Sequence, residues 1–215
     1  MPQKPDPRFL AITAHDLRGA VGVLDGAMKE LTREVSKDNS DAAKLASMMS
    51  RSAQRLLLLG DRLSVLGKLM DGSAIELGES SDVLALVKEA ASRAFAAHAR
   101  RNLTLRIEGA AVSAPHHAPS LTGAVSELTA LFCGFSQQEL VIRVAGDAER
   151  VRISFESDNA SESVQRALRD RSSTTQANAG IAFAESVLGH HSGSLELCEN
   201  DGSPVAIHFV IPRHQ

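Results

Sequence analysis

The chain has 215 residues, of which 43% are hydrophobic and 3% aromatic, and its formal net charge is −3. The apolar content supports a folded core, and the length allows one large domain or two small ones. A slightly acidic chain without tryptophan or tyrosine lacks the basic surface and stacking platforms that nucleic acids use, so we expect neither nucleic acid nor an anionic membrane as a partner. No apolar run approaches the ~18 residues of a membrane span, and Met1–Phe9 lacks the apolar core of a signal peptide, so the sequence predicts a cytoplasmic protein.

The first predicted element is a long helix that begins near Leu10. Its apolar positions recur at alternating steps of four and three residues, as in a helix packed against near-parallel neighbours. These positions are Leu10, Ala14, Leu17, Val21, Leu24, Met28, Leu31 and Val35. His15 lies one residue past this apolar seam, so we expect it to point away from the helix neighbours.

A second long helix is predicted after the polar break at Ser36–Ser40, and Asp71-Gly72-Ser73 ends it. Its seam consists of Leu45, Met49, Ser52, Leu56, Leu59, Leu63, Leu66 and Met70. Further apolar residues lie outside that seam: Met48, Leu57, Leu58 and Leu69. One partner helix cannot cover so much apolar surface. Residues 1–72 therefore predict a helical hairpin that pairs with a second copy into a dimeric four-helix bundle.

Residues 73–215 alternate between helical and strand patterns. Strands are predicted at 74–77, 103–107, 139–145, 150–156, 195–198 and 205–211, and helices at 82–100, 119–135 and 180–191. Tight turns are expected at Gly146-Asp147 and Asp201-Gly202, and residues 161–176 are polar and loop-like. The pattern predicts an α+β fold in which one layer of helices covers a mixed sheet, a two-layer sandwich.

Two stretches carry a family resemblance that covers essentially the whole chain. "FLAITAHDLRGAV" at 9–21 and "SGSLELCENDGSPVAIHFVIP" at 192–212 resemble the phospho-acceptor motif and the closing hairpin of sensor histidine kinase cores. In the first motif His15, Asp16 and Arg18 fit the family pattern, whereas Ala20 stands where a proline is usual. The resemblance implies a dimerising phosphotransfer hairpin followed by a domain of the histidine kinase ATPase type.

The nucleotide-binding boxes of that family match poorly. Leu131 and Gly134 stand where the family has a magnesium-binding asparagine and a lysine. Ser157, with Asp158 one place off, stands at the adenine-binding aspartate, and Gly180 is the one glycine kept from the pair beside the phosphates. Leucine cannot coordinate magnesium, and side chains in place of glycine hinder the approach of the backbone to phosphate. We therefore expect a degenerate nucleotide site that binds no ATP, and no cofactor.

His15 can still accept a phosphoryl group from a source other than ATP. A neutral imidazole on an open helix face accepts a phosphoryl group near neutral pH, Asp16 can steady the ring, and Arg18 can meet phosphoryl oxygens or an acidic partner. Some bacterial histidine phosphotransferases resemble this combination of a dimeric hairpin and a degenerate kinase-like domain. The resemblance thus implies a phosphotransferase that relays phosphate to or from receiver aspartates, with magnesium supplied by the receiver. Gly19 stands where related kinases often orient a water for dephosphorylation, so we expect transfer without hydrolysis.

Two alternatives stay open: an ATP-dependent sensor histidine kinase core with divergent boxes, and a non-catalytic pseudokinase scaffold. The expected partners are a second copy of the chain and the receiver domains of response regulators, a receiver within a hybrid histidine kinase included. The remaining histidine pairs, His116-His117 and His190-His191, have no third ligand nearby in sequence, so we expect no metal site.

Overall fold

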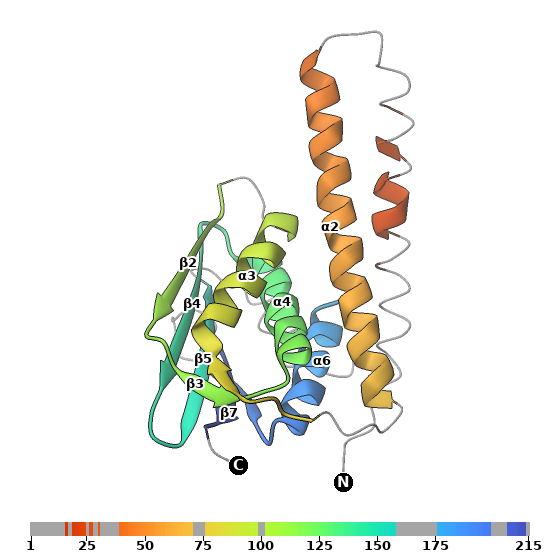
Figure 1. Cartoon of the computed structure of the whole chain (residues 1–215). Coiled ribbons are helices and arrows are strands. Elements are labelled where there is room, and N and C mark those ends of the chain that lie inside the picture. The colour runs from red at the N-terminus through yellow and green to blue at the C-terminus, as the bar shows by residue number, and fades with distance from the viewer. Residues whose placement is uncertain are drawn as a thin grey trace.

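The computed structural model describes residues 16, 19–24, 26–27, 30, 39–70, 76–98, 102–157, 176–198 and 206–213. A sheet, a layer of helices and the long helix α2 (Asn39–Met70) follow one another across the molecule, and the residues of the first helix lie on the far side of α2 (Figure 1). The Asn39 end of α2 extends beyond the sheet and the helix layer. Within the described part of the chain, no helix combines the length and the apolarity that a bilayer crossing requires.

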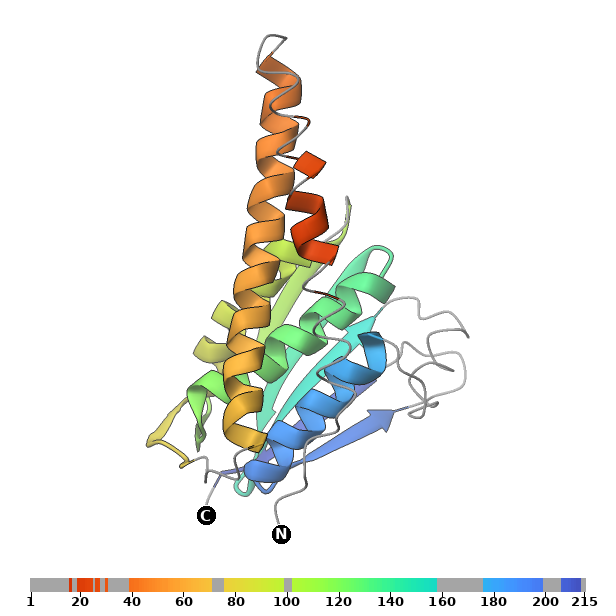
Figure 2. The ribbon, with the colours of Figure 1, turned by 90° about the vertical axis from the view of Figure 1, so that its right-hand side faces the viewer.

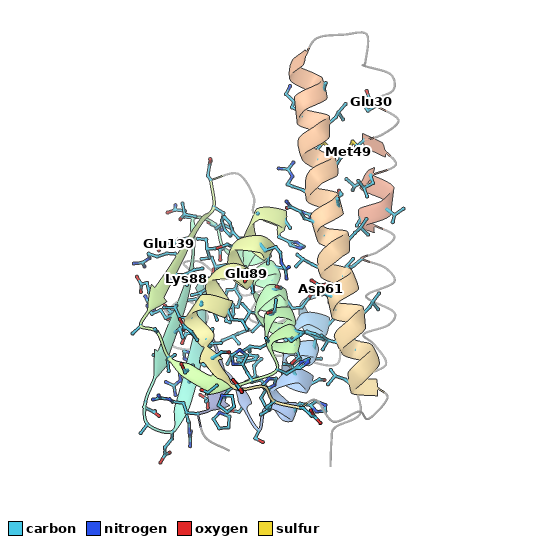
Figure 3. The ribbon with its side chains drawn as sticks, in the orientation of Figure 1. Glu30, Met49, Asp61, Lys88, Glu89 and Glu139 are labelled. Atoms are coloured by element: carbon cyan, nitrogen blue, oxygen red, sulfur yellow. The ribbon has the colours of Figure 1, made fainter. Side chains whose placement is uncertain are left out.

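The first helix is represented by residues 16, 19–24, 26–27 and 30, which are helical and run beside α2 in both ribbon views (Figures 1 and 2). Met49 points from α2 toward this helix (Figure 3). Ala20 and Ala27 are buried, whereas Val21 is 49% exposed. Within a single chain Ala20 and Ala27 are thus covered, whereas Val21 of the predicted seam is not. Small alanines let two helices approach closely, and the larger Val21 is left on the outside.

Helix α2 carries two buried stripes. The first repeats every seven residues at Leu45, Ser52, Leu59 and Leu66. The second consists of Leu58, Arg62, Val65 and Leu69. Leu58 clusters with two alanines of the helix layer, and Leu69 is part of the main core. The prediction that Leu58 and Leu69 need a second copy of the chain is therefore wrong, since the chain's own second part covers them.

The second part of the chain contains a five-stranded mixed sheet with the strand order β2-β4-β5-β7-β6. The strands are β2 (Thr104–Gly109), β4 (Glu139–Gly146), β5 (Arg150–Ser157), β7 (Ala206–Pro212) and β6 (Ser194–Cys198). β2 and β4 are parallel, and the other neighbours are antiparallel. A parallel pair needs a crossover connection, and helix α4 (Ala118–Phe135) supplies it.

Three helices cover one face of this sheet: α3 (Val83–His98), α4 and α6 (Gln176–His190) (Figure 2). Between the layers lie the fully buried rings of Phe132, Phe155, Phe183 and Phe209. Burying each such ring contributes roughly 1.5–3 kcal/mol. On their other side α3 and α4 contact α2, so the helix layer is held between the sheet and the hairpin.

Most of the elements predicted for residues 82–211 are confirmed to within a few residues. The β4–β5 pair turns at Asp147, whose Oδ1 accepts hydrogen bonds from the N–H groups of Glu149 and Arg150, both at 2.8 Å. The closing antiparallel pair β6–β7 is also confirmed. The polar stretch at 161–176 lies outside the described residues up to residue 175.

The strand predicted at 74–77 is wrong at residues 76 and 77, the two of these residues that the structure describes. Residues 76–78 have no regular secondary structure, and residues 71–75 lie outside the described residues. A short strand instead occurs at β1 (Ser80–Asp82), antiparallel to β3 (Ser113–Pro115), a strand that the sequence pattern did not reveal. Asp82 Oδ1 accepts the N–H of Leu84 at 2.9 Å, and this cap starts α3 directly after the strand.

Candidate functional site

A buried cluster of three charged side chains joins the hairpin to the second part of the chain. Arg62 of α2 donates from Nε to Glu127 Oε1 of α4 at 2.7 Å and from Nη2 to the other carboxylate oxygen. The third nitrogen of the guanidinium, Nη1, lies 3.8 Å from Asp16 Oδ2 of the first helix. The exposed fractions of the Arg62, Asp16 and Glu127 side chains are 6%, 12% and 11%. Asp16, predicted from sequence as a site residue, thus lies in an ion cluster that spans three helices.

Electrostatics within this cluster are governed by burial. Burial raises the pKa of the Glu127 carboxyl, Arg62 opposes that rise through its charge and hydrogen bonds, and the charge of Asp16 adds to it. One arginine faces two carboxylates, so the cluster carries a net negative charge when all three groups are ionised. Removing one partner of such a cluster leaves an uncompensated buried charge, which costs several kcal/mol.

The other two predicted residues of the acceptor motif, His15 and Arg18, lie outside the described residues. The first helix nevertheless shows an open side at Gly19, Gly22 and Gly26, all exposed, where an added Cβ atom would meet nothing within 4 Å. Residues three and four positions apart share one face of a helix, so these glycines form an uncovered side of the first helix among the described residues.

The residues at the magnesium and lysine positions of the resembled family are a leucine and a glycine of α4. Leu131 is half-buried and packs against the main hydrophobic core, and Gly134 is exposed with open space around it. The neighbouring Cys133 is buried, and burial raises the pKa of its thiol to about 12, so the thiol stays protonated at neutral pH. Positions 131 and 134 thus provide no side-chain oxygen of the kind that magnesium prefers.

The residues expected at the adenine and phosphate positions belong to β5 and α6 or lie outside the described residues. Ser157 ends β5 with its side chain buried, and its hydroxyl carries no charge; Asp158 lies outside the described residues. Gly180 is the fifth residue of α6, so its N–H belongs to the helix interior, whereas only the first four N–H groups of a helix are free to bind an anion. An added Cβ on Gly180 would lie 3.7 Å from Glu127 Oε2, so this glycine borders the ion cluster.

The remaining histidines that the sequence singled out make structural hydrogen bonds. His116 donates from Nδ1 to the carbonyl of Ala114 at 2.9 Å, and His117 accepts the N–H of Ser120 as the N-cap of α4. His191 donates from Nδ1 to a backbone carbonyl of α6 and accepts the N–H of His117 at 3.1 Å, while burial lowers its pKa. Among the residues that the structure describes, no three His, Cys, Asp or Glu side chains are grouped to hold a metal ion.

A second set of polar contacts fixes α2 to α3. Arg55 donates from Nε to the carbonyl of Ala97 at 2.9 Å, at the end of α3. His98 follows, and burial together with the charges of Arg55 and Arg62 lowers its pKa to about 4, so this imidazole is neutral at physiological pH. Asp61, labelled in Figure 3, forms an exposed ion pair with Arg93 at 3.4 Å.

Sequence reasoning missed Arg62 and Glu127, although each leaves a signal. Glu127 is the sole charged residue of α4, and a single charge within an otherwise apolar helix needs a buried partner. Arg62 interrupts the apolar stripe of α2 between Leu58 and Val65. Neither signal identifies the partner, because the two residues are 65 positions apart in the chain.

No protein-family model and no curated protein sequence matches the chain. Solved structures, by contrast, match over nearly its full length. The Acinetobacter baumannii histidine kinase AdeS is 14% identical with a TM-score of 0.58, covering 93% of this chain and 98% of that one. A histidine kinase from Burkholderia phymatum STM815 is 17% identical with a TM-score of 0.51, covering 94% and 98%.

A structure described as a bacterial phosphotransferase is also similar, at 12% identity and a TM-score of 0.55, covering 97% of this chain and 99% of that one. These matches define the class: the chain has the fold of a histidine kinase core, with a mixed α+β domain of the ATPase type. At these identities the comparison speaks to the fold, and the function has to be argued from the site.

Proposed function

We propose that the chain is a histidine phosphotransfer protein of two-component signalling, which passes a phosphoryl group to or from receiver aspartates through His15 without using ATP. The proposal is supported by a histidine kinase core fold that carries apolar or side-chain-free residues at the positions expected to bind magnesium-ATP. Leu131 packs into the core, and the N–H of Gly180 belongs to a helix interior. The part that would supply phosphate is degraded, while the part that accepts it keeps His15 and its acidic neighbour.

The proposed step exchanges one phosphorus bond for another. A lone pair on one nitrogen of the neutral His15 ring attacks the phosphorus of a receiver aspartyl phosphate, the bond to the carboxyl oxygen breaks, and the aspartate leaves as a carboxylate. The second ring nitrogen holds the imidazole proton, which Asp16 or solvent can accept. Magnesium bound by the receiver neutralises the phosphoryl oxygens, and Arg18 adds a positive charge from this chain.

A homodimer is part of the proposal and is supported by the exposed apolar surface. The large hydrophobic residues that stay exposed in the described chain are Val21, Val23, Met48 and Leu63. All of them belong to the hairpin, and such surface is characteristic of a protein interface. A second hairpin that covers part of this surface would complete a four-helix bundle.

The proposal is tested by following a radioactive phosphoryl group from a phosphorylated receiver. The wild-type chain is expected to acquire the label with magnesium and without ATP, and the His15→Ala variant is expected to acquire none. Free phosphate, measured separately, is expected not to rise, because Gly19 has no side chain to hold an attacking water. Labelling directly from ATP would instead indicate a histidine kinase, and no labelling from any cognate receiver would indicate a scaffold.

A further inference from the structure

The buried cluster of Arg62, Asp16 and Glu127 does more than connect the two parts of the chain. We propose that Arg62 is a positioning residue for phosphoryl transfer, because it holds the carboxylate of Asp16, the residue directly after the acceptor histidine. Glu127 of α4 in turn fixes the guanidinium of Arg62. The degenerate domain thus restricts the position of Asp16, the neighbour of the acceptor in sequence. The inference rests on the proposed function.

The three nitrogens of the Arg62 guanidinium make different contacts. Nε and Nη2 are both engaged by the Glu127 carboxylate, a two-point contact that fixes the plane of the group. Nη1 remains on the side of Asp16, at ion-pair distance, and is buried without a hydrogen-bond partner in the part of the chain that the structure describes. A donor so placed attracts the carboxylate of Asp16 and restricts where it can lie.

The cluster is also built to be rigid. Its members come from the first helix, α2 and α4, and each side chain is nearly nine-tenths or more buried. Gly180 of α6 lies next to Glu127. Val65 and Leu66, which follow Arg62 along α2 by about one helical turn, belong to the main hydrophobic core. A supporting shell that is locked by packing holds a reacting group more accurately than an exposed one does.

The chain provides a matched control one residue away. Asp61 of α2 pairs with Arg93 of α3, so this ion pair also connects the hairpin to the second part of the chain. Its side chains are 56% and 45% exposed, and no contact of Asp61 with the acceptor helix is among the described interactions. If any loosened contact between the two parts were enough to impair transfer, Asp61→Asn would act like Glu127→Gln.

The kinetic arm uses the full-length chain and a phosphorylated receiver. Glu127→Gln keeps the shape of the side chain but removes its charge and one acceptor oxygen, so Arg62 loses the two-point contact that orients it. The saturating transfer rate is expected to fall roughly tenfold to a hundredfold, the scale of a misplaced supporting group, with the half-saturating receiver concentration unchanged. Asp61→Asn is expected to change neither. Thermal melting of both variants verifies that they are folded.

A spectroscopic arm tests the cluster without phosphate. Among the described residues, the charged groups that face the Glu127 carboxylate are Arg62 from α2 and Asp16 from the first helix. Carboxyl ¹³C resonances titrated against pH are therefore expected to show a lower Glu127 pKa in Asp16→Asn than in wild type, because a neighbouring negative charge is gone.

The inference would be overturned by equal transfer rates in Glu127→Gln and Asp61→Asn. It would also be overturned if the pKa of Glu127 were the same in Asp16→Asn as in wild type. A wild-type chain that never accepts the label, beside a Glu127 titration that responds to Asp16→Asn, would overturn the proposed function instead and leave the cluster as a structural link.

Discussion

Replacing Arg62 by methionine tests the energetic weight of the buried cluster. The substitution keeps much of the side-chain volume but leaves the carboxylates of Asp16 and Glu127, 12% and 11% exposed, without their shared cation. Removing one partner of a buried ion pair costs about 3–5 kcal/mol. For a protein of this size that corresponds to a fall in melting temperature of roughly 6–20 °C.

The loss of stability should depend on pH, and the sign follows from Glu127. Burial and the charge of Asp16 raise the pKa of Glu127, and Arg62 opposes them, so without Arg62 the pKa rises further. A group whose pKa is raised in the folded state contributes stability below its unfolded pKa, near ~4.3, and that contribution is lost as the pH rises through the folded pKa. Arg62→Met should therefore cost little stability in acid, where Glu127 is protonated, and much more at neutral pH.

Urea unfolding followed by circular dichroism, at one protein concentration and at about pH 5 and about pH 8, measures this difference. Adding Glu127→Gln to Arg62→Met should remove most of the pH dependence, because the group that titrates is gone. As a control, Arg93→Met breaks the exposed pair with Asp61 and should cost less than about 1 kcal/mol at either pH. An Arg62→Met variant that loses no more stability than this control, or the same amount at both pH values, would refute the reasoning.

Further outcomes are expected elsewhere in the chain. Leu131→Asn restores the residue type that holds magnesium in the resembled family, yet calorimetry should still detect no ATP binding; micromolar affinity would contradict the reading of the nucleotide region. Gly180→Ala should stabilise the chain by about 0.5–1 kcal/mol in urea unfolding, because its Cβ makes an ordinary contact and alanine favours the helix; a clear loss of stability would point to another role. Leu63→Glu should halve the mass measured by light scattering. Lys88→Gln changes the net charge by the same amount at an exposed position of α3 and should leave the mass unchanged. A monomeric wild-type protein would exclude the dimer.

The fold was largely predictable because local patterns specify most of it. The turn at Asp147 and the alternation in β4 and β5 define a hairpin within a short stretch of chain. The pairing of β1 with β3 was not predictable, because both strands are three residues long and α3 separates them. Spacing alone also did not tell which apolar residues of the first helix are covered within one chain, as Ala20 is, and which stay exposed, as Val21 does.

The candidate site was predictable only where a motif is contiguous. His15, Asp16 and Arg18 stand together in the sequence, so their resemblance to an acceptor motif is visible there. The contact of Arg62 with Glu127 joins two helices from different parts of the chain and leaves no local pattern. The sequence also did not tell what covers Leu58. An apolar residue can be buried against a second copy of the chain or against the same chain, and only the contacts of Leu58 with the helix layer show that the same chain covers it.

A reconstituted relay tests the central claim most directly. A receiver carrying labelled aspartyl phosphate is mixed with this chain and a second receiver, with magnesium and without ATP, and the label on all three proteins is followed in time. The label is expected to pass through the chain to the second receiver with the wild-type protein and to stay on the first receiver with His15→Ala. Transfer to the second receiver that is equally fast with His15→Ala, or that takes place only after ATP is added, would contradict an ATP-independent relay through His15.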